Sequence, residues 1–164
     1  MDREGRCPVR RRRAPRVGLR AALGRSSVAL DTAAFICVIE EHPRYLPLLA
    51  PLLREADEGR RQLVTSALTL LEVLVVPYRA GDAALAERYE MLLTRGRGLD
   101  LVDLDRAVLL GAAQLRARTR IRTPDALQLA AALLRGCSAF VTNDRKLPEV
   151  AGLRVVQLGD YSAY

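Results

Sequence analysis

The chain has 164 residues, half of them hydrophobic, so it is long enough for one domain with a substantial core and too short for two ordinary domains. It carries 26 basic and 19 acidic side chains, which gives a formal net charge of +7. A single His and three scattered Cys argue against Ser/His/Asp catalysis, a histidine-based metal site and a disulfide framework.

The positive charge is concentrated in the first 26 residues. This segment holds nine Arg and two acidic residues, whereas residues 27–164 hold 17 basic and 17 acidic residues and have no net charge. Its Arg-rich, apolar-poor composition predicts a disordered extension over residues 1–26, compatible with a nucleic-acid-binding arm, a transit-like segment or an over-extended start. Because it lacks the apolar core of a secretory signal and no later stretch has the length of a membrane span, we expect a soluble, cytoplasmic protein.

Strands and helices alternate through the first half of the remaining chain. Ser27–Leu30 is an apolar run typical of a strand buried on both faces. The further elements expected here are a helix at Ala33–Glu41, a helical segment at Pro43–Gly59 interrupted by Pro47 and Pro51, a strand at Leu63–Ser66, and helices at Leu68–Arg79 and Asp82–Arg95.

The second half continues the same alternation. The expected elements are a strand at Leu99–Leu104, a helix from Asp105 to about Arg118, a helix that begins at Thr123-Pro124-Asp125 and ends at Gly136, and strands at Ala139–Thr142 and Leu153–Leu158. Strands that alternate with helices predict an α/β fold, with a mostly parallel five-stranded sheet and helices on both faces.

Four acidic side chains are expected at one edge of this sheet. Asp31 and Asp144 follow the first and fourth strands, Asp125 lies in the first turn of the helix that leads to the fourth strand, and Glu72 lies about one turn into the helix after the second strand. Crossover helices begin near the carboxyl ends of the strands, where open parallel sheets bind their ligands. We therefore expect the four carboxylates to converge.

Each of these acids also has a purely structural interpretation. Asp31 is suited to cap the next helix, Asp125 to face a positive helix end, Asp144 to form a turn, and Glu72 to lie on a solvent-facing stripe. Convergence favours a functional interpretation, because carboxylates a few ångström apart repel one another unless a hard cation neutralises them. Carboxylate oxygens suit Mg²⁺ or Mn²⁺, and no thiolate or imidazole set favours zinc.

A divalent cation held in this way can activate water for in-line attack on phosphorus and stabilise the departing oxygen. Thr32, Thr142 and Asn143 are placed to position the water or a phosphate oxygen, although each is equally suited to a local cap. These residues point to phosphodiester hydrolysis.

The sequence resembles PIN-domain proteins, and specifically VapC-type toxins of bacterial toxin–antitoxin pairs. The resemblance covers about residues 27–158 and is carried by LDTAA at 30–34, TLLEVLV at 69–75, RTPDALQLAAAL at 122–133 and FVTND at 140–144. It places the metal-binding acids of the family at Asp31, Glu72, Asp125 and Asp144, and the polar pair before the last acid at Thr142 and Asn143. Gln128 stands where the family often has His or Tyr.

The resemblance implies a three-layer α/β/α fold and a Mg²⁺- or Mn²⁺-dependent endoribonuclease that leaves a 5′-phosphate and a 3′-hydroxyl. It also implies a homodimer and a cognate antitoxin that blocks the active site. Two alternatives remain: a PIN nuclease that processes RNA without an antitoxin, and a non-catalytic RNA-binding module that uses the basic extension.

Two other phosphate-handling folds fit poorly. A phosphorylated receiver domain needs an early acidic pair and a Lys after a later strand, whereas the single Lys of this chain, Lys146, follows Asp144 closely. A haloacid-dehalogenase-type phosphatase needs a second Asp two residues after the first, where this chain has Ala33.

Overall fold

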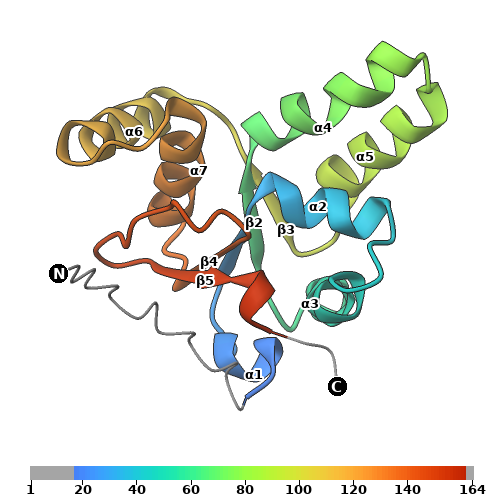
Figure 1. Ribbon diagram of the computed structural model, residues 1–164, viewed down its shortest axis with the longest axis horizontal. Helices are drawn as coiled ribbons and strands as arrows, with labels where there is room; N and C mark the ends of the chain where they lie inside the picture. Colours follow the sequence, from blue (N-terminus) through green and yellow to red (C-terminus); the bar gives the residue numbers. More distant parts are fainter. Residues whose placement is uncertain (1–16, 162–164) are drawn as a thin grey trace, which may run out of the picture.

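The computed structural model describes residues 17–161 as a parallel β-sheet with helices on both faces (Figure 1). In chain order the elements are α1 (Leu19–Leu23), β1 (Val28–Leu30), α2 (Thr32–Ile39), α3 (Leu46–Asp57), β2 (Leu63–Ser66), α4 (Ala67–Ala80), α5 (Ala83–Arg95), β3 (Leu99–Val102), α6 (Arg106–Arg118), α7 (Thr123–Leu134), β4 (Ala139–Thr142), β5 (Arg154–Gln157) and η1, a 3₁₀ turn (Leu158–Asp160). This confirms the predicted five-stranded α/β fold.

The sheet is parallel throughout and has the strand order β3-β2-β1-β4-β5. Every residue of β1, β2 and β4 is buried, which explains why these strands are continuous apolar or small-residue runs. The chain leaves β1 for β2 on one side and later returns to β4 on the other side of β1. The order therefore reverses between β1 and β4, and such a switch point opens a crevice at the carboxyl edge of a sheet.

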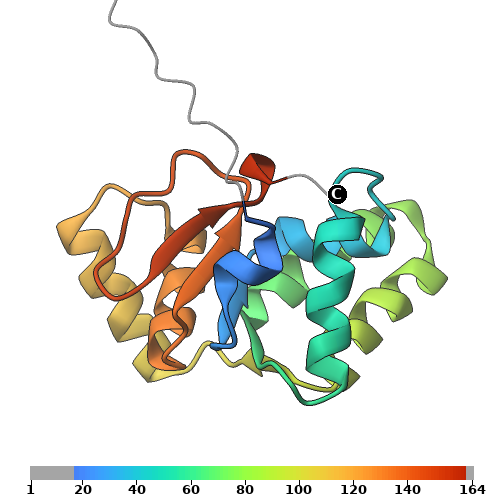
Figure 2. The same cartoon turned by 90° about the horizontal axis from the view of Figure 1, so that it is seen from below.

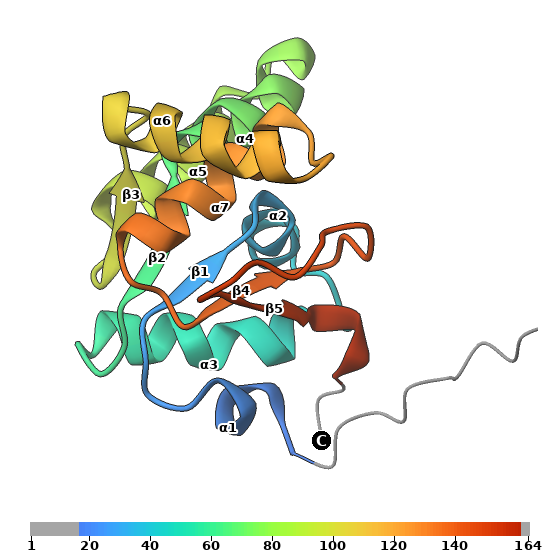
Figure 3. The same cartoon turned by 90° about the vertical axis from the view of Figure 1, so that its left-hand side faces the viewer.

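The hydrophobic core has two parts, one on each face of the sheet. Val28 and Leu30 of β1 join a cluster with α1, α2, α3, α4 and α5. Ala29, which points to the other face, joins a second cluster with α6 and α7. Figures 2 and 3 show the resulting three layers, with α6 and α7 on the opposite side of the sheet from α3. No helix within residues 17–161 is both long enough and apolar enough to cross a membrane.

Helix α3 corrects one sequence prediction. The segment was expected to be interrupted at Pro47 and Pro51, but it is one helix of 12 residues. Pro47 lies in the first turn, where its missing N–H removes no intrahelical bond. Pro51 lies inside the helix, and the buried side chains of Leu48, Leu49 and Leu52 hold the flanking turns against the core.

Helix α1 corrects a second prediction. Residues 1–16 of the expected disordered extension lie outside the described residues, but Leu19–Leu23 is helical and belongs to the domain. Leu19 and Leu23 are buried in the first core cluster, and Arg20 pairs with Glu55 of α3. The Arg154 guanidinium also donates to the Ala22 carbonyl, at 2.7 Å.

Replacement of Leu23 by Ala should therefore destabilise the whole domain. Leu23 is 3% exposed, and loss of a buried leucine side chain typically costs about 3 kcal/mol in the free energy of unfolding. Urea denaturation measures this change, with Val17→Ala as the control because Val17 is 50% exposed. Equal stability of the two variants would show that α1 is not part of the cooperative fold.

Candidate active site

The ends of β1 and β4 bring Asp31 and Asp144 to the same edge of the sheet. The Asp31 N–H donates to the Val141 carbonyl at 3.0 Å and so completes the last pair of the β1–β4 ladder, Leu30 with Val141. Thr142, the last residue of β4, then joins the two acids. Its hydroxyl donates to Asp31 Oδ2 at 2.6 Å and accepts from the Asp144 N–H at 3.0 Å.

Asp31 lies in a partly buried, negatively charged environment. Burial raises the pKa of its carboxyl, the neighbouring charges of Glu72 and Asp125 raise it further, and the hydrogen bond from Thr142 opposes these effects. Although Asp31 is the N-cap residue of α2, its side chain makes no capping hydrogen bond. The backbone N–H of Thr32, the first residue of α2, nevertheless lowers the pKa of Asp31, so the helix-start interpretation holds in part.

Glu72 of α4 faces the beginning of α2. Its Oε2 accepts a hydrogen bond from the hydroxyl of Thr32, the residue after Asp31. The carboxylate is half-buried and its charge acts on Asp31. The expected polar stripe therefore faces solvent only in part, because Thr65 and Thr69 are buried and Glu72 is half-buried.

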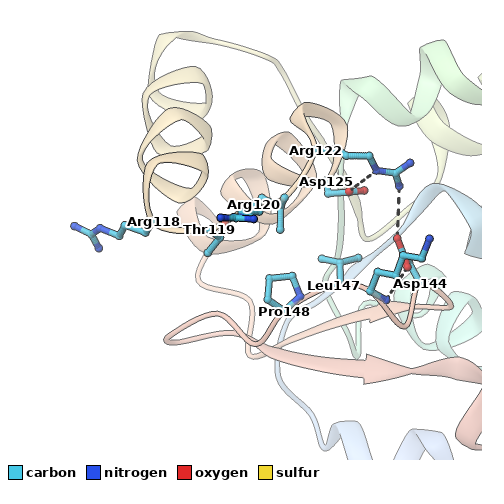
Figure 4. A pocket seen from close by; sticks show the side chains of 10 residues that line it. Arg118, Thr119, Arg120, Arg122, Asp125, Asp144, Leu147 and Pro148 are labelled. Carbon is cyan, nitrogen blue, oxygen red and sulfur yellow. Dashed lines mark hydrogen bonds and ion pairs between the residues drawn. The ribbon is translucent and has the colours of Figure 1, made fainter.

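Asp125 and Asp144 share a guanidinium. Arg122, which precedes α7, places Nε 3.1 Å from Asp125 Oδ2 and a terminal nitrogen 3.5 Å from Asp144 Oδ2 (Figure 4). The hydrogen bond to Asp125 is the main cause of the raised pKa of Arg122, and the charges of Asp125, Asp144 and Asp31 act in the same direction. Three of the four acids, Asp31, Asp125 and Asp144, thus raise the pKa of the Arg122 guanidinium.

The other contacts of Asp144 hold its loop. Asp144 Oδ1 accepts from the Lys146 N–H at 2.8 Å, and Gln157 of β5 donates to the Asp144 carbonyl at 2.9 Å. The turn-forming interpretation of Asp144 is therefore correct for one carboxylate oxygen. The second oxygen faces Arg122.

These residues fit a hard divalent cation in charge and donor chemistry. All the converging donors are carboxylate and hydroxyl oxygens, and a cationic group already lies between two of the carboxylates. Among residues 17–161, no three Asp, Glu, His or Cys side chains are close enough to enclose an ion. The acids are instead stabilised separately: Asp31 by Thr142, Glu72 by Thr32, and Asp125 and Asp144 by Arg122.

Comparison with known proteins identifies the family of this protein. A family model described as the PIN domain matches residues 28–153. The chain belongs to the PIN domain family. No curated protein sequence matches the chain. PIN domains are generally nucleases and typically use divalent metals.

Several solved structures share the PIN fold of this chain. VapBC2 from Rickettsia felis, bound to a DNA fragment from its promoter, has 18% sequence identity and a TM-score of 0.64, with 80% of this chain and 98% of that chain covered. A toxin–antitoxin complex from Klebsiella pneumoniae has 19% identity and a TM-score of 0.60, with 80% and 97% covered. DNA-bound VapBC from Salmonella typhimurium has 22% identity and a TM-score of 0.57, with 81% and 98% covered.

A cavity of about 700 Å³ opens beside the acids of this PIN domain. Asp125 and Asp144 form its acidic end, and Arg118, Arg120 and Lys146 contribute positive charge to its lining. The apolar part of the lining consists of Ile121, Leu147 and Pro148. The acids therefore adjoin a hollow lined by both cationic and apolar side chains. Figure 4 shows Arg122, Asp125 and Asp144 together at one end of it.

The remaining predicted site residue is Asn143, whose side chain lies near Gly159. Its Oδ1 lies within 3.5 Å of the point that a Cβ atom on Gly159 would occupy. No hydrogen bond within residues 17–161 joins its side chain to any of the four acids, and its catalytic role stays a prediction. Arg122 was not predicted, although its position three residues before Asp125 is a spacing at which helical side chains meet.

The raised pKa of Asp31 predicts how stability depends on pH. The folded protein holds this proton more tightly than the unfolded chain, for which the ordinary value is 3.8. Below pH 3.8 the carboxyl is protonated in both states and does not change the free energy of unfolding. As pH rises through the higher pKa of the folded state, the ionised carboxylate lowers the free energy of unfolding. Without divalent metal, Asp31→Asn should raise the melting temperature at pH 7, and the gain should shrink towards pH 4.

Thermal unfolding between pH 4 and pH 8 measures this effect. Asn keeps an oxygen that can accept the bond from Thr142, so the substitution removes mainly the charge. Asp103→Asn is the matched control, because Asp103 is an exposed acid just beyond β3. A lower melting temperature of Asp31→Asn at pH 7 would contradict the prediction.

Proposed function

We propose that this protein is a divalent-metal-dependent endoribonuclease, the toxin component of a toxin–antitoxin pair. The observation that supports it most is the convergence of Asp31, Glu72, Asp125 and Asp144 from four different elements on the switch-point edge of a PIN domain. Carboxylates at one edge repel one another unless a cation neutralises their charge, and a bound metal ion would do so.

In this proposal the four acids hold Mg²⁺ or Mn²⁺. The bound cation would lower the pKa of a water molecule and stabilise the departing oxygen of the phosphodiester. Thr142 orients Asp31, and Thr32 orients Glu72, so these two carboxylates are preorganised. Asn143 remains a candidate for contact with the water or a phosphate oxygen.

The cavity beside the acids supports a polyanionic substrate. Arg118, Arg120 and Lys146 can neutralise successive backbone phosphates, and the apolar lining is suited to unstacked bases. Arg122 is 75% exposed in its side chain, so its guanidinium is accessible to a phosphate that approaches the acids. RNA as the nucleic acid follows from the likeness of the four motifs to those of VapC-type toxins.

A protein partner is suggested by the structures that share this fold. The similar structure from K. pneumoniae is a toxin–antitoxin complex. We propose that this chain likewise binds a cognate antitoxin and forms a homodimer.

Loss of one of the acids should abolish cleavage. We expect purified protein with Mg²⁺ to cut single-stranded RNA to fragments with 5′-phosphate and 3′-hydroxyl ends, and Asp144→Asn to reduce the rate on the order of 100-fold or more. End-labelled RNA and sequencing of the fragments measure the rate and the ends. Asp103→Asn, a charge-matched control at the same edge of the sheet, should cut normally. An Asp144→Asn protein as fast as wild type would rule out the proposal.

The basic lining of the cavity should determine how binding depends on salt. Each phosphate contact with a single strand contributes about 0.7 to the slope of log affinity against log salt concentration. The double variant Arg118→Ala/Arg120→Ala should therefore bind RNA more weakly and have a slope about 1.4 smaller.

Fluorescence anisotropy of labelled RNA in EDTA measures this slope without cleavage. Arg95→Ala is the control, because Arg95 ends α5 at the opposite edge of the sheet, just before β3. A slope unchanged in the double variant would place the RNA elsewhere on the surface.

A further inference from the structure

A buried hydrogen-bond network, most of which has no role in the proposed function, lies next to the acids. Its members are Thr32 of α2, Thr65 of β2, Thr69 of α4 and Gln128 of α7, and each is at most 8% exposed. The Gln128 amide nitrogen lies 3.1 Å from the Thr32 hydroxyl and 2.7 Å from the Thr69 hydroxyl. The network therefore joins both layers of helices through the sheet.

A group that can only donate fixes the orientation of the Gln128 amide. The backbone N–H of Ser66 lies 3.4 Å from Gln128 Oε1. If the amide were reversed, its NH₂ group would face this N–H, and two donors would meet in a buried site. Gln128 therefore points its oxygen at Ser66 and both of its N–H bonds at the two threonines.

The direction of every other proton in the network follows. Thr65 donates to the Leu30 carbonyl at 3.0 Å, because a carbonyl can only accept. Each hydroxyl has one proton. Thr65 must therefore accept from Thr69, whose hydroxyl lies 2.8 Å away.

The second branch of the network ends at an acid. Thr32 accepts from Gln128 and has one proton left, which it donates to the Glu72 carboxylate. The 3.1 Å contact between the Thr32 and Thr69 hydroxyls then holds no proton, because Thr69 donates its single proton to Thr65 and Thr32 donates its own to Glu72. Two branches thus start at one amide: Gln128 to Thr32 to Glu72, and Gln128 to Thr69 to Thr65 to the Leu30 carbonyl.

We propose that Gln128 is a positioning residue for metal binding, which acts through Thr32 to keep Glu72 oriented as an acceptor at the sheet edge. This inference rests on the proposed function, because it assumes that Glu72 binds metal. The other buried side chains of α7 are apolar, and a polar side chain among them is costly unless its donors and acceptors are satisfied. An apolar residue would fill the same space without that requirement, but it would make neither the two bonds to the threonines nor the bond from the Ser66 N–H.

The two branches allow a sharp test. Thr32→Val and Thr69→Val each remove one hydroxyl with little change in volume, but only Thr32 contacts Glu72. We expect Thr32→Val to weaken Mn²⁺ binding about tenfold, the lower end of what loss of a ligand's hydrogen-bond partner costs. Thr69→Val should leave the Mn²⁺ affinity within about twofold of wild type, although it disturbs the same buried network.

Gln128→Met tests the amide itself. It should weaken Mn²⁺ binding by a factor similar to that of Thr32→Val, and the double variant should be no weaker than either single variant, because both act through one bond to Glu72. Gln114→Met is the control, because Gln114 is an exposed glutamine on the neighbouring helix α6. Electron paramagnetic resonance of free Mn²⁺ gives the affinities without reference to activity, and melting temperatures report the structural cost of each variant.

The possible results separate the two hypotheses. If wild-type protein binds no Mn²⁺ and cuts no RNA, the proposed function fails. If wild type binds Mn²⁺ but Thr32→Val binds it equally well, or Thr69→Val weakens binding as much as Thr32→Val does, the positioning role fails and the proposed function survives. If Gln128→Met does not fold, the comparison of the two threonine variants still decides the role of this branch.

Discussion

Burial of the Asp31 carboxylate beside other acids is the constraint to which the rest of this edge of the structure responds. The parallel sheet and its switch point between β1 and β4 bring Asp31, Glu72, Asp125 and Asp144 together whether or not their charges favour it. Burial adds a second cost at Asp31, whose pKa is raised by desolvation before any neighbouring charge acts. The hydrogen bonds and ion pairs around the acids are the means by which the fold accommodates this charge.

The sequence was most informative where a single physical pattern controls the structure. Strands β2 and β4 were predicted with their observed bounds, because buried parallel strands leave a clear apolar run between polar ends. The placement of the acids at one edge was also predictable, since it depends only on the rule that crossover helices begin at the carboxyl edge of the sheet. Neither inference required knowledge of side-chain conformations.

The sequence was least informative where contacts between distant residues decide. Helix α1 has only five residues and two buried leucines, so its helical pattern is too short to recognise within an Arg-rich segment. What holds it is tertiary: the pair between Arg20 and Glu55 and the bond from Arg154 to the Ala22 carbonyl. Arg122 was missed for a related reason, because local sequence does not show that one guanidinium will face two acids from different elements.

The hydrogen bonds divide the four acids into a fixed pair and an adaptable pair. Asp31 and Glu72 accept from threonines that are themselves buried, and the partner of Glu72 is further held by Gln128. Asp125 and the second oxygen of Asp144 contact Arg122, whose side chain is 75% exposed to solvent, whereas the first oxygen of Asp144 is held by the Lys146 N–H. A buried hydroxyl has no competing partner, whereas an exposed guanidinium is readily exchanged.

This division has a consequence for how a cation and a phosphodiester would meet at this edge. A site that must hold a metal firmly and still admit and release a charged polymer needs rigid ligands on one side and replaceable contacts on the other. The rigid pair contacts the buried network from the end of β1 and the first half of α4, and the replaceable pair borders the basic cavity. The polymer would therefore approach from the side where Arg122 can exchange a carboxylate for a phosphate without disturbing the fixed pair.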